Sequence, residues 1–128
     1  MIITLIVFDS FTGNVKRFTE KVVEKTDLKA VQIKDGLIIK EPFVLFTYTT
    51  GFGKVSESTM KFLNRGNFMN LVGVASSGNM NWGVDLFARS GNLIADKYNV
   101  PLLHKFENEG MESDVKEVIH RMKELNIK

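Results

Sequence analysis

Apolar runs and amphipathic segments alternate along the chain. The apolar runs have the length and the β-branched and aromatic content of strands buried on both faces, which are typical of parallel sheets. The predicted strands are Ile2–Phe8, Leu28–Ile33, Phe43–Tyr48, Met69–Ala75 and Leu102–Phe106. Apolar residues at helical spacing lie between them. The predicted helices are the segment carrying Val15, Phe18, Thr19, Val22 and Val23, and the ranges Ser56–Asn64, Asp85–Tyr98 and Glu112–Leu125. This alternation predicts an α/β fold with a largely parallel sheet.

The stretch between Ile33 and Phe43 interrupts the alternation. It has room for a tight turn at Lys34-Asp35-Gly36 and a few extended residues. A parallel crossover normally needs about a dozen residues and usually carries a helix. We therefore expect a short hairpin-like or extended excursion there, with one face of the sheet partly uncovered.

Composition narrows the class of protein. With 128 residues, of which 44% are hydrophobic and 25% charged, the chain suits a single domain over residues 1–128. The absence of cysteine excludes disulfides, thiolate metal sites and cysteine nucleophiles. A formal net charge of +2, without a long block of either sign, does not favour nucleic-acid binding. Neither a secretory signal nor a membrane-spanning run is visible, so we expect a cytoplasmic globular domain.

Three polar segments containing glycine follow predicted strands. They are DSFTGN (9–14), TTGFGKVS (49–56) and SSGNMNWG (76–83). In an open α/β sheet, ligands bind beyond the carboxyl ends of the strands, so these segments are expected to meet at one edge. Together they indicate a ligand with a phosphate at one end and a planar polar ring at the other.

The first segment has two interpretations. The hydroxyls of Ser10 and Thr12, the backbone N–H groups around Gly13 and Asn14, and the start of a helix would together form an anion site. The segment lacks the GxxxxGK[ST] and GxGxxG patterns and contains no lysine or arginine, so neutral donors would hold the anion. Alternatively, the Ser, Thr and Asn side chains only cap the helix.

The other two segments are equally open to two interpretations. Gly51 and Gly53, on either side of Phe52, would allow close approach of the backbone to a ligand. They would otherwise belong to a flexible loop with the Phe52 ring folded onto the core. Trp82, the only tryptophan, would stack on a flat ring together with the neighbouring amides, or would close the edge of the core.

Neither the two histidines nor the acidic residues near the C-terminus are expected to take part in chemistry. His104 and His120 are far apart and lack the spacing of metal ligands, so no metal or catalytic role is expected for either. A solvated acidic loop is expected after the fifth strand, at Glu107, Glu109 and Glu112.

On its three polar segments the chain resembles the flavodoxin-like FMN-binding proteins, and more closely the NrdI flavoproteins of class Ib ribonucleotide reductase systems. The matching stretches are FDSFTGNV (8–15), TYTTGFG (47–53) and SGNMNWG (77–83). The order of strands and helices agrees from end to end, including the short excursion. The resemblance implies one flavodoxin-like FMN-binding domain, with a five-stranded parallel sheet of order 2-1-3-4-5 and helices on both faces.

The resemblance implies FMN as the cofactor and a set of residues for each part of it. The phosphate would be held by Ser10, Thr12, Gly13, Asn14 and Val15. The isoalloxazine would be bordered on one side by Thr49, Thr50, Gly51, Phe52 and Gly53. Its other side would be flanked by Ser77, Gly78, Asn79, Trp82 and Gly83. The family pattern has arginine between the two asparagines of the third segment, where this chain has Met80, so redox tuning and partner affinity do not follow from the resemblance.

The family's activity is implied in the same way. Reduced FMN converts oxygen to superoxide, which is passed to the dimanganese β subunit of the reductase and generates its tyrosyl radical. The chemistry belongs to the flavin, so neither a catalytic side chain nor a metal ligand is expected. The implied partners are that β subunit, a flavin or flavodoxin reductase as electron donor, and oxygen, with no nucleic acid and no membrane.

Two alternatives belong to other classes. A generic short-chain flavodoxin electron carrier would present a strongly acidic partner surface, which the net charge of +2 does not support. A receiver-like or phosphate-binding module would need acidic residues clustered at strand ends to hold Mg²⁺, and Asp9 alone is suitably placed.

Overall fold

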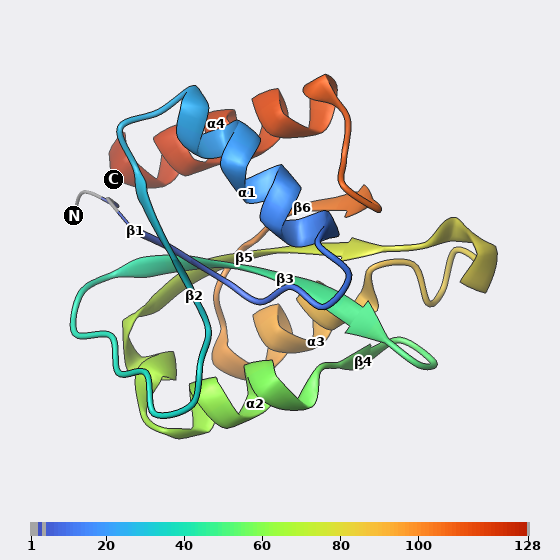
Figure 1. Ribbon diagram of the computed structural model, residues 1–128, viewed down its shortest axis with the longest axis horizontal. Coiled ribbons are helices and arrows are strands. Elements are labelled where there is room, and N and C mark those ends of the chain that lie inside the picture. The colour runs from blue at the N-terminus through green and yellow to red at the C-terminus, as the bar shows by residue number, and fades with distance from the viewer. Residues whose placement is uncertain (1–2, 4, 128) are drawn as a thin grey trace.

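A parallel sheet forms the middle layer of the molecule (Figure 1). The computed structural model describes residue 3 and residues 5–127. Its strands are β1 (Leu5–Phe8), β2 (Lys29–Gln32), β3 (Phe43–Thr50), β4 (Lys54–Val55), β5 (Leu71–Gly78) and β6 (Leu102–Glu107). Its α-helices are α1 (Asn14–Glu24), α2 (Glu57–Asn64), α3 (Arg89–Tyr98) and α4 (Glu112–Ile127), and its 3-10 helices are η1 (Asn67–Asn70) and η2 (Met80–Trp82).

The order of the main strands is β2-β1-β3-β5-β6, and every neighbouring pair along it is parallel. This confirms the predicted order 2-1-3-4-5. Ile2 and Thr4 of the first predicted strand lie outside the described residues. The two-residue strand β4, which was not predicted, pairs antiparallel with the end of β3. The strand order reverses between β1 and β3, which is the place where a ligand site is expected in such a sheet.

The sheet is covered on both faces, by α1 and α4 on one side and by α2 and α3 on the other (Figure 1). The central strand β1 contributes to both sides because successive side chains of a strand point to opposite faces. Ile6 and Phe8 pack in one core cluster with Phe18 of α1. Leu5 and Val7 pack in a second cluster on the other face. This double burial accounts for the continuous apolar run that predicted the strand.

The excursion after β2 is extended, as expected, and begins with a turn at residues 35–36. It also covers the sheet, contrary to the expectation of a partly bare face, because Ile39 is buried in the second core cluster. The buried Asn67 side chain accepts a hydrogen bond from the Ile39 N–H (2.8 Å) and donates one to the Leu37 carbonyl oxygen (2.9 Å). These bonds satisfy backbone groups that a helix would otherwise have paired internally.

Several predicted boundaries differ from those in the structure, and two of these differences have a clear physical cause. The strand predicted from Met69 begins at Leu71, because residues 67–70 form η1. The helix predicted from Asp85 begins at Arg89, because Ala88 adopts a left-handed conformation (φ +48°) that no helix continues through. The Ala88 carbonyl oxygen instead accepts a hydrogen bond from the Ser76 hydroxyl (2.7 Å).

Among the described residues, none of the helices combines the length and the apolar character needed to cross a lipid bilayer.

Candidate functional site

The carboxyl ends of β1, β3 and β5 open onto a cavity of about 320 Å³, a size at the lower end of small-molecule sites. The predicted site residues that line it are Ser10, Thr12, Asn14, Val15, Thr49, Thr50, Gly51, Ser77, Gly78, Asn79 and Trp82. The structure therefore brings all three polar segments together. Four further lining residues were not in the predicted set: Phe11, Tyr48, Leu86 and Asn108.

Four predicted residues are not among those that line the cavity. Gly13 is the N-cap of α1, and Gly83 ends η2. Gly53 lies against the side chains of α3 and the segment before it. Phe52 is 68% exposed at the tip between β3 and β4, so its ring does not fold onto the core.

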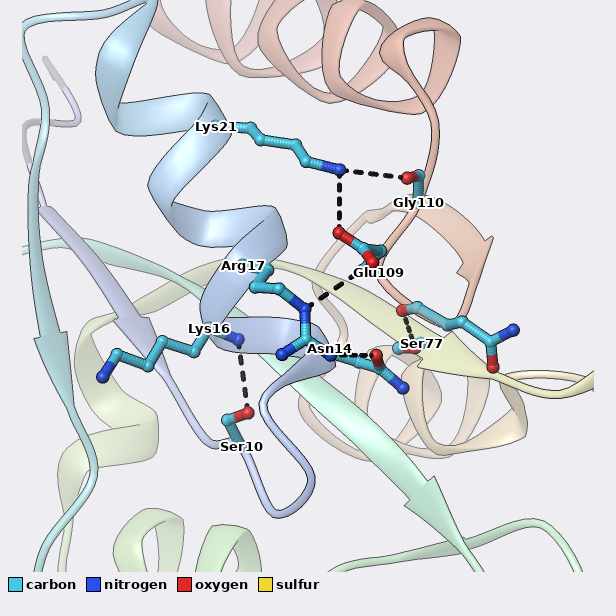
Figure 2. Close-up of polar contacts among 9 residues, drawn as sticks. Ser10, Asn14, Lys16, Arg17, Lys21, Ser77, Glu109 and Gly110 are labelled. Atoms are coloured by element: carbon cyan, nitrogen blue, oxygen red, sulfur yellow. Dashed lines mark hydrogen bonds and ion pairs between the residues drawn. The ribbon is translucent and has the colours of Figure 1, made fainter.

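The first segment leaves donors of α1 unpaired. The N-cap residue Gly13 has no side chain, and it adopts a left-handed conformation (φ +93°) that favours glycine. Ser10 Oγ accepts from the N–H of Lys16 at 3.2 Å (Figure 2). The structure shows no acceptor among the described residues for the backbone N–H groups of Asn14 and Val15. Capping by side chains is thus confined to Ser10, and the helix start keeps free donors that suit an anion.

The second segment is hydrogen bonded to α3 through its first residue, Thr49. The Thr49 hydroxyl donates to Ser90 Oγ (2.9 Å) and accepts from the Ser90 N–H (3.2 Å). The residues beyond Thr50 turn back through β4. Gly51 has φ +50°, and a Cβ atom there would meet nothing within 4 Å. Gly51 thus lines the cavity with open space around its Cβ position, while the Thr49 side chain is already engaged.

The third segment is held by the last residue of β6 and by the loop after it. The Ser77 hydroxyl donates to the Asn108 carbonyl oxygen (2.6 Å), and the Asn108 N–H donates to the Gly78 carbonyl oxygen (3.0 Å). The Met80 N–H donates to Glu107 Oε2 (2.9 Å). Within the segment, Asn79 Oδ1 accepts from the N–H of Asn81 (2.8 Å).

The end of β6 and the loop after it are therefore a fourth part of the site. Glu107 and Glu112 are exposed to solvent, as expected, but Glu107 and Glu109 also make contacts that the sequence did not predict. Glu109 also reaches α1, with ion pairs to Arg17 (3.6 Å) and Lys21 (3.3 Å). Asn108 has a positive φ (+53°), which Asn tolerates better than most residues, so an asparagine just after a predicted strand was a weak local signal of a special turn.

Aromatic side chains surround the mouth of the cavity. The Phe11 ring stacks on Tyr48, with centroids 6.3 Å apart and planes 26° apart. Across the mouth, Phe52 meets Trp82 edge to face at 5.4 Å. Phe11 and Trp82 are 82% and 52% exposed. The cavity thus combines neutral hydrogen-bond donors from the first segment with aromatic side chains such as Tyr48 and Trp82, a combination suited to a phosphorylated planar ring.

Asp9 and His104 make their contacts outside the cavity. The buried Asp9 carboxylate accepts hydrogen bonds from the hydroxyls of Ser56, Ser58 and Thr59 at the start of α2, and Asp9 does not line the cavity. His104 Nε2 lies 2.7 Å from Asp114 Oδ1. Within the described part of the chain, no cluster of three or more His, Cys, Asp or Glu side chains could hold a metal ion.

Solved structures share this fold. A short-chain flavodoxin associated with a non-canonical PDU bacterial microcompartment superposes with a TM-score of 0.74, at 17% identity, covering 96% of this chain and 95% of that one. A Fusobacterium nucleatum flavodoxin bound to flavin mononucleotide gives a TM-score of 0.65, also at 17% identity, covering 98% and 97%. The fold is that of the flavodoxin-like class.

Sequence comparison narrows the class to one family. Residues 6–120 match the family described as NrdI Flavodoxin like. The chain is 44% identical over 122 residues to "Protein NrdI" of Macrococcus caseolyticus, covering 95% of this chain and 91% of that protein. The chain therefore belongs to the NrdI family, as its three polar segments indicated.

Proposed function

We propose that this protein binds FMN in the cavity at the ends of β1, β3 and β5 and acts as an NrdI-type electron-transfer flavoprotein. When bound and reduced, FMN supplies the electron that converts oxygen to superoxide for the dimanganese–tyrosyl radical cofactor of a class Ib ribonucleotide reductase β subunit. One observation carries the proposal: a cavity whose neutral anion-binding end and aromatic end match the two parts of a flavin mononucleotide.

At the phosphate end, the chain would act through hydrogen bonds. The unpaired N–H groups of Asn14 and Val15 point from the start of α1, where the helix dipole also favours an anion. The hydroxyls of Ser10 and Thr12 add donors. The donor set fits a phosphate monoester without a direct ion pair.

At the ring end, the chain would orient the flavin and limit its contact with water. Tyr48 and Trp82 offer flat surfaces, and the open backbone of Gly51 can hydrogen bond to the ring edge. Because Thr49 and Ser77 are anchored by their own hydrogen bonds, both segments would hold the ring in one position.

The proposal also covers partners and location. Exposed apolar side chains gather in the segments that form the mouth of the cavity: Phe11, Phe52, Met80, Trp82 and Val84. Such a surface next to a redox cofactor suits docking of a protein partner, here the reductase β subunit, with a flavin or flavodoxin reductase as electron donor. We propose the cytoplasm as the location, on the strength of the family alone.

Titration of the apoprotein with FMN tests the cofactor. We expect uptake at micromolar concentrations, with the absorption spectrum of a bound flavin. Failure to take up FMN would refute the proposal.

Stopped-flow oxidation of the reduced holoprotein separates the proposal from a generic flavodoxin. We expect superoxide formation on mixing with oxygen, and tyrosyl radical formation when a manganese-loaded class Ib β subunit is present. Reoxidation that leaves the β subunit without a radical would favour the generic electron carrier.

A further inference from the structure

Arg17 lies directly behind the phosphate end of the cavity, although the first segment itself contains no basic residue. Its Nη2 donates a hydrogen bond of 2.7 Å to Asn14 Oδ1. A Cβ atom built on Gly13 would lie 2.8 Å from Arg17 Nη1, so the guanidinium packs against the backbone of the segment. Arg17 is not among the residues that line the cavity, whereas Asn14 is. Any effect of Arg17 on a ligand therefore passes through Asn14 or through its charge.

The contact decides which end of the Asn14 amide is available to a ligand. A side-chain amide carries an acceptor oxygen and a donor NH2 group, whereas a guanidinium carries donors only. Arg17 must therefore face the oxygen of Asn14, which leaves the NH2 group for the cavity. An amide turned the other way would present its oxygen to an anion and repel it.

The guanidinium is itself held by groups distant in the sequence. Arg17 Nε lies 3.6 Å from Glu109 Oε1, and Lys21 Nζ lies 3.3 Å from Glu109 Oε2 (Figure 2). Lys21 Nζ also donates to the Gly110 carbonyl oxygen at 3.3 Å. Two cations share one carboxylate, so a net positive charge remains beside the phosphate end. Arg17 and Glu109 are each nearly half exposed, so this network contributes little to global stability.

We infer that Arg17 is the residue that makes this cavity selective for a phosphorylated flavin: it positions the Asn14 amide as a donor to a phosphate monoester dianion. The inference rests on the proposed FMN site and adds to it a specificity residue outside the cavity wall. It distinguishes FMN from riboflavin, which has the same ring and no phosphate.

The test compares dissociation constants for FMN and riboflavin, measured by quenching of flavin fluorescence. Arg17→Met removes the donor and the charge and keeps the length of the side chain. We expect it to weaken FMN binding by roughly tenfold, the order of one charge-assisted hydrogen bond. Riboflavin binding should change by less than about twofold, because riboflavin lacks the group that Asn14 would contact.

Lys16→Met is the matched control. Lys16 is in the same turn of α1 and carries the same charge, but its side chain points away from Arg17 and Asn14 (Figure 2). Its backbone N–H bond to Ser10 is retained in the variant. The ratio of FMN to riboflavin affinity should stay near that of the parent protein. In an Asn14→Ala background, Arg17→Met should cost less FMN affinity than it does in the parent protein, because the part of its effect that passes through Asn14 is already lost.

The outcomes show whether the inference alone fails or the proposed function fails with it. A parent protein that binds neither flavin refutes both. A parent protein that prefers FMN, with the same preference in Arg17→Met, overturns the inference alone. An equal loss for FMN and riboflavin in Arg17→Met, or a loss no larger than that of Lys16→Met, also overturns it.

Discussion

The rings of Phe52 and Trp82 meet edge to face, with centroids 5.4 Å apart and planes at 81°. The two residues are thirty positions apart in the chain and belong to different segments, one between β3 and β4 and the other in η2. Their contact joins the second and third segments at the mouth of the cavity. Edge-to-face pairs of this kind contribute about 0.5–1.5 kcal/mol beyond their buried area, so each ring helps to place the other.

Trp82 should report on occupancy of the cavity. It is the only tryptophan and it lines the cavity, so its fluorescence should fall when FMN binds. The measurement is tryptophan emission during titration with FMN. Trp82→Phe is the control, because it removes the emission while flavin absorption still follows binding. Unchanged Trp82 emission at saturating FMN would place the flavin elsewhere.

Gly51→Val should impair FMN binding more than folding. The valine strains a backbone with φ +50°, at a cost of about 1–2 kcal/mol, and fills open space beside the cavity. We expect FMN affinity to fall by roughly tenfold or more, which corresponds to about 1.4 kcal/mol or more. The measurements are the dissociation constant and the melting temperatures of the apo and holo forms.

Gly36→Val is the control for this variant. Gly36 also has a positive φ (+80°) and open space around its Cβ position, but it lies in the turn after β2. Both variants should lower the melting temperature of the apoprotein, while Gly36→Val leaves FMN affinity unchanged. If the two variants lost FMN affinity equally, Gly51 would have no special relation to the flavin.

Asp9→Ala should destabilise the fold. The buried carboxylate accepts from three hydroxyls at the start of α2, and its removal leaves them without that acceptor. We expect a loss of about 3 kcal/mol in the free energy of unfolding, measured with urea. Asp27→Ala, at an exposed position, should change it by less than about 0.5 kcal/mol. Similar small changes for both variants would contradict the structural role of Asp9.

The ion pair between Lys25, the C-cap residue of α1, and Glu112 of α4 should give a small pH dependence. Hydrogen bonding to Lys25, whose Nζ lies 2.9 Å from Glu112 Oε2, lowers the pKa of Glu112 from its ordinary value of 4.5. A lowered pKa in the folded state means that the pair stabilises the protein above pH 4.5 and stops doing so as the pH falls through the folded-state pKa. The stability difference between the parent protein and Glu112→Gln should therefore be constant near neutral pH and shrink in acid. A difference that grew on acidification would contradict this sign.

The order of the strands and helices could be predicted from local patterns. The run from Leu5 to Phe8 is apolar at every position because both faces of β1 are buried, and Ser56 precedes α2 as its N-cap, with Oγ accepting from the N–H of Thr59. These features depend on residues that are close together in the sequence, so the spacing of apolar and polar residues is enough to predict them.

Some local features were not predictable because tertiary packing decides them. Alanine favours helices, yet Ala88 is left-handed: its backbone packs against Gly78, where a Cβ atom would lie 2.4 Å from the Ala88 nitrogen. Met69 fits a strand pattern, yet η1 forms there because Asn67 is buried against the excursion after β2.

Only part of the candidate site was predictable, because tertiary contacts decide the rest. The three polar segments were recognisable by their glycines, hydroxyls and amides. The part played by the end of β6 and the loop after it was not recognisable. Glu107 and Asn108 act through contacts with residues about thirty positions earlier in the chain, and Glu109 acts through contacts with α1. A carboxylate in a polar stretch looks the same in the sequence whether it is solvated or bonded.

The loop after β6 also bears on the timing of biosynthesis. The ribosome releases the chain from its N-terminus, so the segments around Asn14, Gly51 and Asn79 emerge well before Asn108. The hydrogen bonds that join Ser77 and Met80 to Asn108 and Glu107, and the ion pair between Glu109 and Arg17, can form only once these last residues have been synthesised. A growing chain therefore carries the three polar segments before it carries the contacts that hold the third one in place.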